Sequence, residues 1–333
     1  MEKDKTTALK KGIAYIGALQ NGHGYWEDFA VSEVGSSNQW VTGYIGYALL
    51  QQNNTSEYLK KAAAWLLANE LPGGGWGYNH NTLADADSTA NVVRMLANFN
   101  EVNGNRELLH RLADFLLSFQ DHDTGGFVTY RPDTAQVFAR SKWCKSEISV
   151  TAMSGLALLG IAGKRYREVL LHIKKFLLKR QLPEGCWDSY WWNGRMYGVS
   201  LSVNFLKQTG EDAAAKKGLA WIIGQLDSPL SPFDTALALS ALEAAHDRRA
   251  GYAEIADTVL LRLLKMQRPD GSWNSGPILK VPNPYENLPP WERTGNIPTR
   301  CVEEQHRLFT TATAVGALKR RPLSPSQHPD SQG

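Results

Sequence analysis

The chain lacks several features that mark large classes of protein. It contains no run of 18 apolar residues, so we expect no membrane-spanning helix. Only three cysteines occur, Cys144, Cys186 and Cys301, and this odd, widely spaced set predicts free thiols rather than a disulfide framework. The formal net charge is only +3, which argues against a nucleic-acid-binding surface.

The first residues, Met-Glu-Lys-Asp-Lys, also lack the apolar stretch of a secretory signal peptide. Together with free thiols, this predicts a cytoplasmic protein. Apolar side chains are abundant instead, at 43% of the 333 residues, with 11 Trp and 12 Tyr. This composition is ample for one large core.

A repeated turn is the most informative pattern in the sequence. Six amphipathic stretches each end in Gln or Glu and are followed by a turn, usually rich in Gly and Trp. The two strictest copies read Q-x-x-x-G-x-W, at 181–187 and 267–273. The six Gln or Glu positions lie 42 to 61 residues apart: Gln20, Glu70, Gln120, Gln181, Gln225 and Gln267. This period predicts a repeat architecture that forms one unit, although length alone suggests two domains.

The stretches between the turns predict paired helices. One set carries an apolar stripe and many charges, which is typical of outer helices: 6–20, 55–70, 106–120, 166–181, 212–226 and 252–267. The other set is poor in charge and rich in Ala, Gly, Ser and Leu, which is typical of buried helices: 38–51, 88–102, 146–161, 195–210, 231–247 and 306–321. We therefore predict an all-α (α/α)6 toroid over residues 1–321, with a central cavity. The Ser/Pro-rich tail, 322–333, is expected to be disordered.

One connection is unusually long. Residues 274–304 hold six prolines and separate the last Gly-Trp turn from the last inner helix. A long loop in a compact domain is often a lid or binding loop. A passive brace across the mouth of the ring is the alternative that the sequence leaves open.

The repeated turn resembles the QW motif of squalene–hopene cyclases and related class II terpene cyclases. The segment 185–198 resembles their G-S-W-x-x-x-W-G-x-x-Y-x-Y-G-T stretch, and Asp85-Ala-Asp87-Ser88-Thr-Ala resembles their D-x-D-D-T-A acid motif. The similarity covers nearly all of residues 1–321. It implies the toroid that terpene cyclases share with the β subunits of protein prenyltransferases. The chain is too short for the second helical domain of full triterpene cyclases, so it looks like the acid-bearing domain alone.

The resemblance also implies a catalytic acid. Class II cyclisation begins with protonation of an alkene or epoxide, which requires a carboxylic acid kept un-ionised by an apolar cavity. By match to the motif, Asp87 is the proton donor and Asp85 its partner. Ser88 replaces the third Asp of the family and is expected to hydrogen-bond Asp87. The residues alone permit a simpler interpretation, in which Asp85 caps a helix and Asp87 lies in its first turn.

A carbocation requires a wall that stabilises charge without attacking it, and aromatic faces provide this. The aromatic candidates lie at the starts of inner helices or in the turns before them: Trp40, Tyr44, Tyr190, Trp191, Trp192, Tyr197, Phe233 and Phe309. Each is also explained by ordinary core packing. Three consecutive aromatic residues on a loop cannot all face the core, so at least one of residues 190–192 should line the cavity. Trp76, Trp187 and Trp273 are expected to be structural.

The sequence also permits other functions. A carbohydrate-active (α/α)6 enzyme could use Asp87 with Glu147 or Asp188. A ring that has lost catalysis could bind an isoprenoid or a protein partner. A protein prenyltransferase would need zinc ligands that are missing at the expected positions, and no D-D-x-x-D motif is present. We therefore expect no metal and no cofactor, a small hydrophobic isoprenoid as substrate, and leave open whether the ring mouth touches a membrane.

Overall fold

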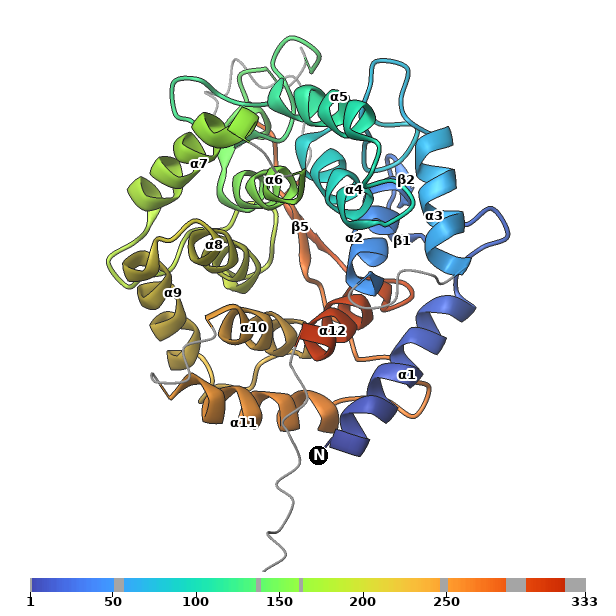
Figure 1. Cartoon of the computed structure of the whole chain (residues 1–333), viewed down its shortest axis with the longest axis vertical. Helices are drawn as coiled ribbons and strands as arrows, with labels where there is room; N and C mark the ends of the chain where they lie inside the picture. Colours follow the sequence, from blue (N-terminus) through green and yellow to red (C-terminus); the bar gives the residue numbers. More distant parts are fainter. Residues whose placement is uncertain are drawn as a thin grey trace, which may run out of the picture.

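The computed structural model describes residues 2–50, 57–135, 139–161, 164–245, 251–285 and 298–320. Within these ranges, helices alternate between the outside and the inside of a ring (Figure 1). The outer helices are α1 (Glu2–Ala18), α3 (Glu57–Ala68), α5 (Arg106–Leu117), α7 (Arg167–Arg180), α9 (Asp212–Gly224) and α11 (Tyr252–Lys265). The inner helices are α2 (Gln39–Leu49), α4 (Ala86–Asn98), α6 (Ile148–Ile161), α8 (Met196–Gln208), α10 (Pro232–Ala245) and α12 (Leu308–Arg320). The predicted outer and inner sets are confirmed within a few residues at each end.

The inner helices close on themselves. Each packs against the next one along the chain, and α12 packs against α2. Close approach depends on small residues at the contacts. A Cβ atom at Gly43 of α2 would lie only 2.8 Å from the backbone nitrogen of Val92 in α4, so these helices could not pack as they do with a larger residue there. In the described parts of the chain, no helix is both long enough and apolar enough to cross a membrane.

The tryptophans of the repeated turns anchor each turn to the outer helix before it. Four of these indoles are completely buried, and each donates its N–H to a backbone carbonyl ten residues earlier at 2.8–2.9 Å: Trp26, Trp76, Trp187 and Trp273. These carbonyls belong to the last turn of a helix, where the regular helical pattern of hydrogen bonds ends. Those of Ile16, Leu66 and Leu263 also accept a turn bond from the residue three positions ahead. The structural role predicted for Trp76, Trp187 and Trp273 is confirmed, and Trp26 has the same role without having been predicted.

The glutamines of the turns join neighbouring outer helices. The side-chain amides of Gln20, Gln181 and Gln267 each donate to a carbonyl of their own turn and to a carbonyl of the next outer helix. The last of these bonds runs from Gln267 to Ala8 at 2.8 Å, so it joins the end of α11 to α1. At the second turn, Glu70 replaces Gln and pairs with Arg111 of α5 at 2.6 Å.

Short strands occur in three connections, which the helical pattern did not predict. They form two-stranded antiparallel ladders: β1 (Asp28–Val31) with β2 (Gly35–Ser37), β3 (Phe127–Val128) with β4 (Ser146–Glu147), and β5 (Leu279–Val281) with β6 (Arg300–Val302). These connections are long enough to double back before the next inner helix begins. Two short 3-10 helices, Lys142–Cys144 and Lys164–Tyr166, complete the described elements.

The described arms of the 274–304 connection form a fixed brace over the ring. Strand β5 runs across the middle of the ring in Figure 1. Its backbone is held by bonds from Asn193 N to Ile278 O and from Lys280 N to Trp191 O, both 2.9 Å, and by the Trp143 indole, which donates to Pro282 O. The centre of the predicted lid, 286–297, and the predicted tail, 322–333, lie outside the described residues.

Candidate active site

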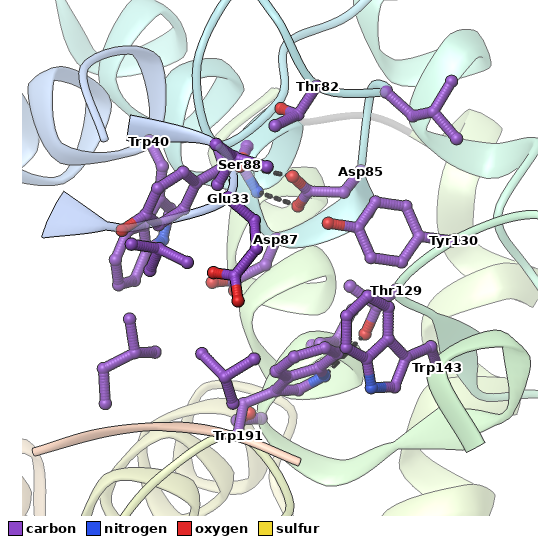
Figure 2. A pocket seen from close by; sticks show the side chains of 18 of the residues that line it. Glu33, Trp40, Thr82, Asp85, Asp87, Ser88, Thr129, Tyr130, Trp143 and Trp191 are labelled. Atoms are coloured by element: carbon purple, nitrogen blue, oxygen red, sulfur yellow. Dashed lines mark hydrogen bonds between the residues drawn. The ribbon is translucent and has the colours of Figure 1, made fainter. Parts of the chain in front are cut away.

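A cavity of about 360 Å³ lies where the starts of α2, α4 and α6 meet the strand ladders. Its wall is largely apolar and aromatic. Six aromatic residues line it: Trp40, Tyr78, Tyr130, Trp143, Trp191 and Trp192. The side chains of Asp85, Asp87 and Ser88 reach the same space from the start of α4 (Figure 2). The cavity therefore brings the predicted acid motif and part of the predicted aromatic set together.

Asp85 is the N-cap residue of α4. Its backbone is extended, with φ −130° and ψ 157°, and its Oδ1 accepts a hydrogen bond from Ser88 N at 2.7 Å. The Ser88 hydroxyl donates to Asp85 Oδ2 at 2.6 Å. The prediction that Ser88 bonds Asp87 is therefore wrong, because the third residue after an N-cap lies beside the cap, whereas adjacent helical residues point to different sides. The capping interpretation is correct for Asp85, which also borders the cavity.

Asp87 lies one residue into the helix and has a different environment. Its carboxyl keeps some accessible surface because it borders the cavity, but its Oδ1 is buried and has no hydrogen-bond partner among the described residues. The Trp40 indole N–H is near without making a bond of good geometry, and it favours the charged form slightly. Burial above all, then the charges of Asp85 and Glu147, raise the pKa of Asp87 from 3.8 to about 8. Asp87 therefore carries a proton at neutral pH.

In the described part of the chain, the neighbouring carboxyls of Asp85 and Glu147, unlike that of Asp87, accept hydrogen bonds. Burial raises the pKa of Asp85 to about 6, and its bonds from Ser88 oppose that rise. Glu147 precedes α6, and its Oε2 accepts bonds from Val150 N at 3.0 Å and from the Ser149 hydroxyl at 2.6 Å. Burial raises the pKa of Glu147 as well. Because hydrogen bonds stabilise an ionised carboxylate, Asp87, whose carboxyl accepts none from the described residues, lacks the interaction that lowers the pKa values of Asp85 and Glu147.

Three of the eight predicted aromatic residues line the cavity: Trp40, Trp191 and Trp192. This confirms that the 190–192 run contributes to the wall. The other five do not line it: Tyr44, Tyr190, Tyr197, Phe233 and Phe309. Four of these form a cluster of rings with Trp40 and Trp192, whereas Tyr190 packs edge-on against Trp191, with Lys142 over its ring. These five rings therefore lie outside the lining of this cavity and pack against other aromatic side chains.

Several lining residues were missed by the sequence interpretation. Tyr78 and Thr129 each stand two residues after the aromatic residue of a repeated turn, Trp76 and Phe127, so position within the repeat was a usable signal. Trp143 comes from a connection without repeat spacing. Glu33 and Arg300, which also line the cavity, form an ion pair between the β1–β2 turn and β6.

Two further acidic residues, the candidate Asp188 and the buried Asp28, lie outside this cavity. Asp188 is outside the cavity lining, exposed, and paired with Arg195 at 2.8 Å. Asp28 is completely buried and accepts bonds from the backbone N–H groups of residues 305, 306 and 308, which holds the start of α12. The pairing of Asp87 with Asp188 that a carbohydrate-active enzyme could use is therefore not formed.

The raised pKa of Asp87 predicts a definite pH dependence. The folded state binds a proton on Asp87 that an unfolded chain releases near pH 4, so this residue's contribution to stability should decline as pH rises towards 8. Any reaction that needs the protonated acid should be flat below about pH 8 and fall roughly tenfold per pH unit above it. A pH–rate profile and denaturant melts from pH 5 to 9 measure both effects. A rate that rises through pH 8 would contradict the assignment.

Part of the chain is similar to a known protein family. Residues 68–229 match the squalene-hopene cyclase C-terminal domain. Drimenyl diphosphate synthase of Streptomyces showdoensis is 25% identical over 232 residues, which cover 64% of this chain. The match spans only 40% of the length of that relative.

Solved structures share the whole fold. The type II terpene cyclase MstE from Scytonema superposes with a TM-score of 0.78 at 24% identity, covering 96% of this chain and 98% of its own. A protein from Actinoplanes is 28% identical, with a TM-score of 0.77 and coverage of 95% and 99%. Residues 68–229 are thus similar to the squalene-hopene cyclase C-terminal domain, and the chain has the fold of the type II terpene cyclase MstE.

Proposed function

We propose that this protein is a class II terpene or meroterpene cyclase. The observation that carries the proposal is Asp87, a carboxylic acid that borders an aromatic cavity, lacks a hydrogen-bond partner among the described residues, and has a pKa near 8. Such an acid is protonated at neutral pH and has no bond to break before it donates. Asp85 and Glu147, held by their own hydrogen bonds, act as the neighbours that keep Asp87 un-ionised.

The reaction begins when the Asp87 hydroxyl transfers its proton to a terminal alkene or epoxide of an isoprenoid. The alkene π electrons, or the opening C–O bond, leave a carbocation, and the next double bond attacks it to close a ring. Loss of a proton from the final cation restores neutrality, and proton uptake by Asp87 resets the site. The product is an isomer of the substrate, so no co-reactant is consumed.

The aromatic residues of the cavity wall stabilise the carbocation. Trp40, Trp191 and Trp192 line the cavity that Asp87 reaches, and aromatic faces attract positive charge. Trp191 is fixed because its indole N–H donates to Thr129 Oγ1 at 2.8 Å. Variants of MstE have been solved with geranylgeranyl dihydroxybenzoate as substrate and with merosterolic acid A as product, which supports a substrate of this class here.

The test is a panel of polyprenyl, epoxy-polyprenyl and prenylated aromatic compounds incubated with the purified protein. The expected result is a product of unchanged mass and altered chromatographic retention. Tight isoprenoid binding without any isomer would support a binding module instead, and release of reducing sugars from glycans would support a carbohydrate-active enzyme. Either outcome would overturn the proposal.

A substitution at Glu147 tests whether neighbouring charge raises the pKa of Asp87. Glu147→Gln removes a negative charge that raises the pKa of Asp87, while its amide oxygen can still accept the bonds from Ser149 and Val150. We expect the pH above which activity is lost to move below that of the parent protein. Asp234→Asn is the matched control, because this partly buried carboxyl at the start of α10 accepts a bond from Ser231 and does not raise the pKa of Asp87. Identical pH profiles for parent and Glu147→Gln would refute the role of Glu147.

We also infer that the enzyme works in the cytoplasm on a small hydrophobic substrate. Three free cysteines, two of them buried, support a reducing compartment. Whether the ring mouth touches a membrane can be measured by co-sedimentation with lipid vesicles.

A further inference from the structure

A layer of aromatic rings closes the inner end of the cavity. Trp192 borders the cavity and stacks on Tyr197, with ring centres 3.8 Å apart and planes at 26°. Beside this pair, Tyr44 stacks on Phe309 at 3.6 Å and 12°. Trp40 joins the two pairs, since it lies 6.0 Å from Trp192 and 4.9 Å from Phe309. We call these five residues the aromatic layer.

A second, smaller cavity of about 60 Å³ lies on the other side of this layer. Tyr44 and Tyr197 line the second cavity, whereas Trp40 and Trp192 line the first. The remaining lining of the second cavity comes from the middle and C-terminal parts of the inner helices, including Ala48, Met153, Leu237 and Gly316. The two cavities are therefore separated by the two stacked pairs of rings.

The layer is held firmly. Its members other than Tyr44 are at most 4% exposed. Trp192 is fixed at its backbone by a bridge to Leu279 of β5, and the Tyr44 hydroxyl bonds Thr313 at 2.7 Å. A closely packed set of this kind cannot make room for a ligand without breaking ring contacts. A substrate chain that enters from the mouth must stop at Trp192.

We propose that the aromatic layer, with Trp192 at its face, sets the maximum length of the isoprenoid chain. This rests on the proposed function for the class of substrate. The first cavity is near the lower end of the range of about 300–1,000 Å³ for small-molecule sites, so the site takes a short or medium prenyl chain and excludes one of triterpene length. Shortening the Trp192 side chain deepens the cavity towards the second one and admits a longer chain.

The test measures binding rather than turnover, so that it stands apart from the cyclase activity. Geraniol, farnesol, geranylgeraniol and squalene are titrated into the Asp87→Asn protein by calorimetry, with and without Trp192→Leu. We expect the Asp87→Asn protein to bind compounds only up to a defined chain length. The protein that also carries Trp192→Leu should bind at least one longer member of the series, with at least a tenfold gain in affinity. Trp191→Leu is the matched control, because this indole borders the side of the cavity and packs on Trp143 rather than on the layer. It should alter affinity without extending the series.

Folding of each variant is checked by near-ultraviolet circular dichroism. If Trp192→Leu does not fold, Trp192→Phe keeps a ring in the layer and is used in the same titration, with a smaller gain expected. An unchanged length limit in a folded Trp192 variant would overturn the inference. So would an equal extension by Trp191→Leu. Binding that follows the expected series while no compound is cyclised would leave this inference standing and remove the proposed function.

Discussion

Asp87→Asn should reduce the rate of cyclisation by about a thousandfold or more, the upper part of the range for loss of a general acid. The amide has nearly the shape of the acid but cannot donate the proton at a useful rate. Its neighbours cannot substitute well, because Asp85 is occupied by Ser88 and Glu147 by the start of α6. Initial rates with the substrate found in the compound panel measure the loss. Substrate affinity should change little, since the amide keeps the shape of the Asp87 carboxyl, whose buried Oδ1 has no hydrogen-bond partner among the described residues.

The same substitution should stabilise the protein at high pH. An amide at position 87 removes the cost of ionising a buried carboxyl, so the stability advantage of Asp87→Asn over the parent should grow between pH 5 and pH 9. Asp188→Asn serves as the control, because this carboxyl lies outside the cavity and pairs with Arg195. It should leave both rate and pH profile as they are. Substantial turnover by Asp87→Asn would remove the mechanism, whatever the products.

Trp187→Ala should destabilise the folded ring by about 3–5 kcal/mol, the range for truncating a large buried aromatic residue. Trp187 has no exposed surface, and its indole N–H bonds the carbonyl of Leu177 at the end of α7. The truncation removes both the packing and the partner of that carbonyl. Urea denaturation followed by circular dichroism gives the free energy of unfolding.

Trp187→Phe separates the two contributions. It retains much of the ring volume and leaves the Leu177 carbonyl without its donor, so the loss should be smaller, about 1–3 kcal/mol. Trp221→Ala on the outer helix α9 is the matched tryptophan control, because this side chain is only partly buried. A loss for Trp187→Ala no larger than that for Trp221→Ala would show that the turn tryptophans do not fasten the ring.

The helical architecture could be predicted because the same sequence pattern occurs in each of the six repeats. The amphipathic outer stretches, the apolar inner stretches and the turns between them recur, and an error in one repeat is corrected by the others. The short strand ladders could not be predicted in this way. Strands such as Phe127–Val128 pair only because a distant segment, Ser146–Glu147, is brought beside them by α5 and α6.

The candidate site was partly predictable for a different reason. The acid motif is local in sequence, so Asp85 and Asp87 could be placed at the start of an inner helix. Which aromatic residues border the cavity depends on how far each inner helix extends towards the axis, and spacing along the chain does not encode that distance. Trp192 and Tyr197 are five residues apart, yet their stacked rings face different cavities.

The hydrogen bond from the Gln267 side chain to the Ala8 carbonyl affects how the protein unfolds. In an open solenoid, stability is roughly a sum over repeats and neighbouring interfaces, so the ends can fray while the middle persists. Here the sixth repeat holds the first, and the ring has no end repeat from which fraying could begin. A substitution that destabilises one repeat should therefore lower the stability of the whole ring. The ring should melt as one cooperative unit, and cutting it between any two repeats should create the weak ends that it otherwise lacks.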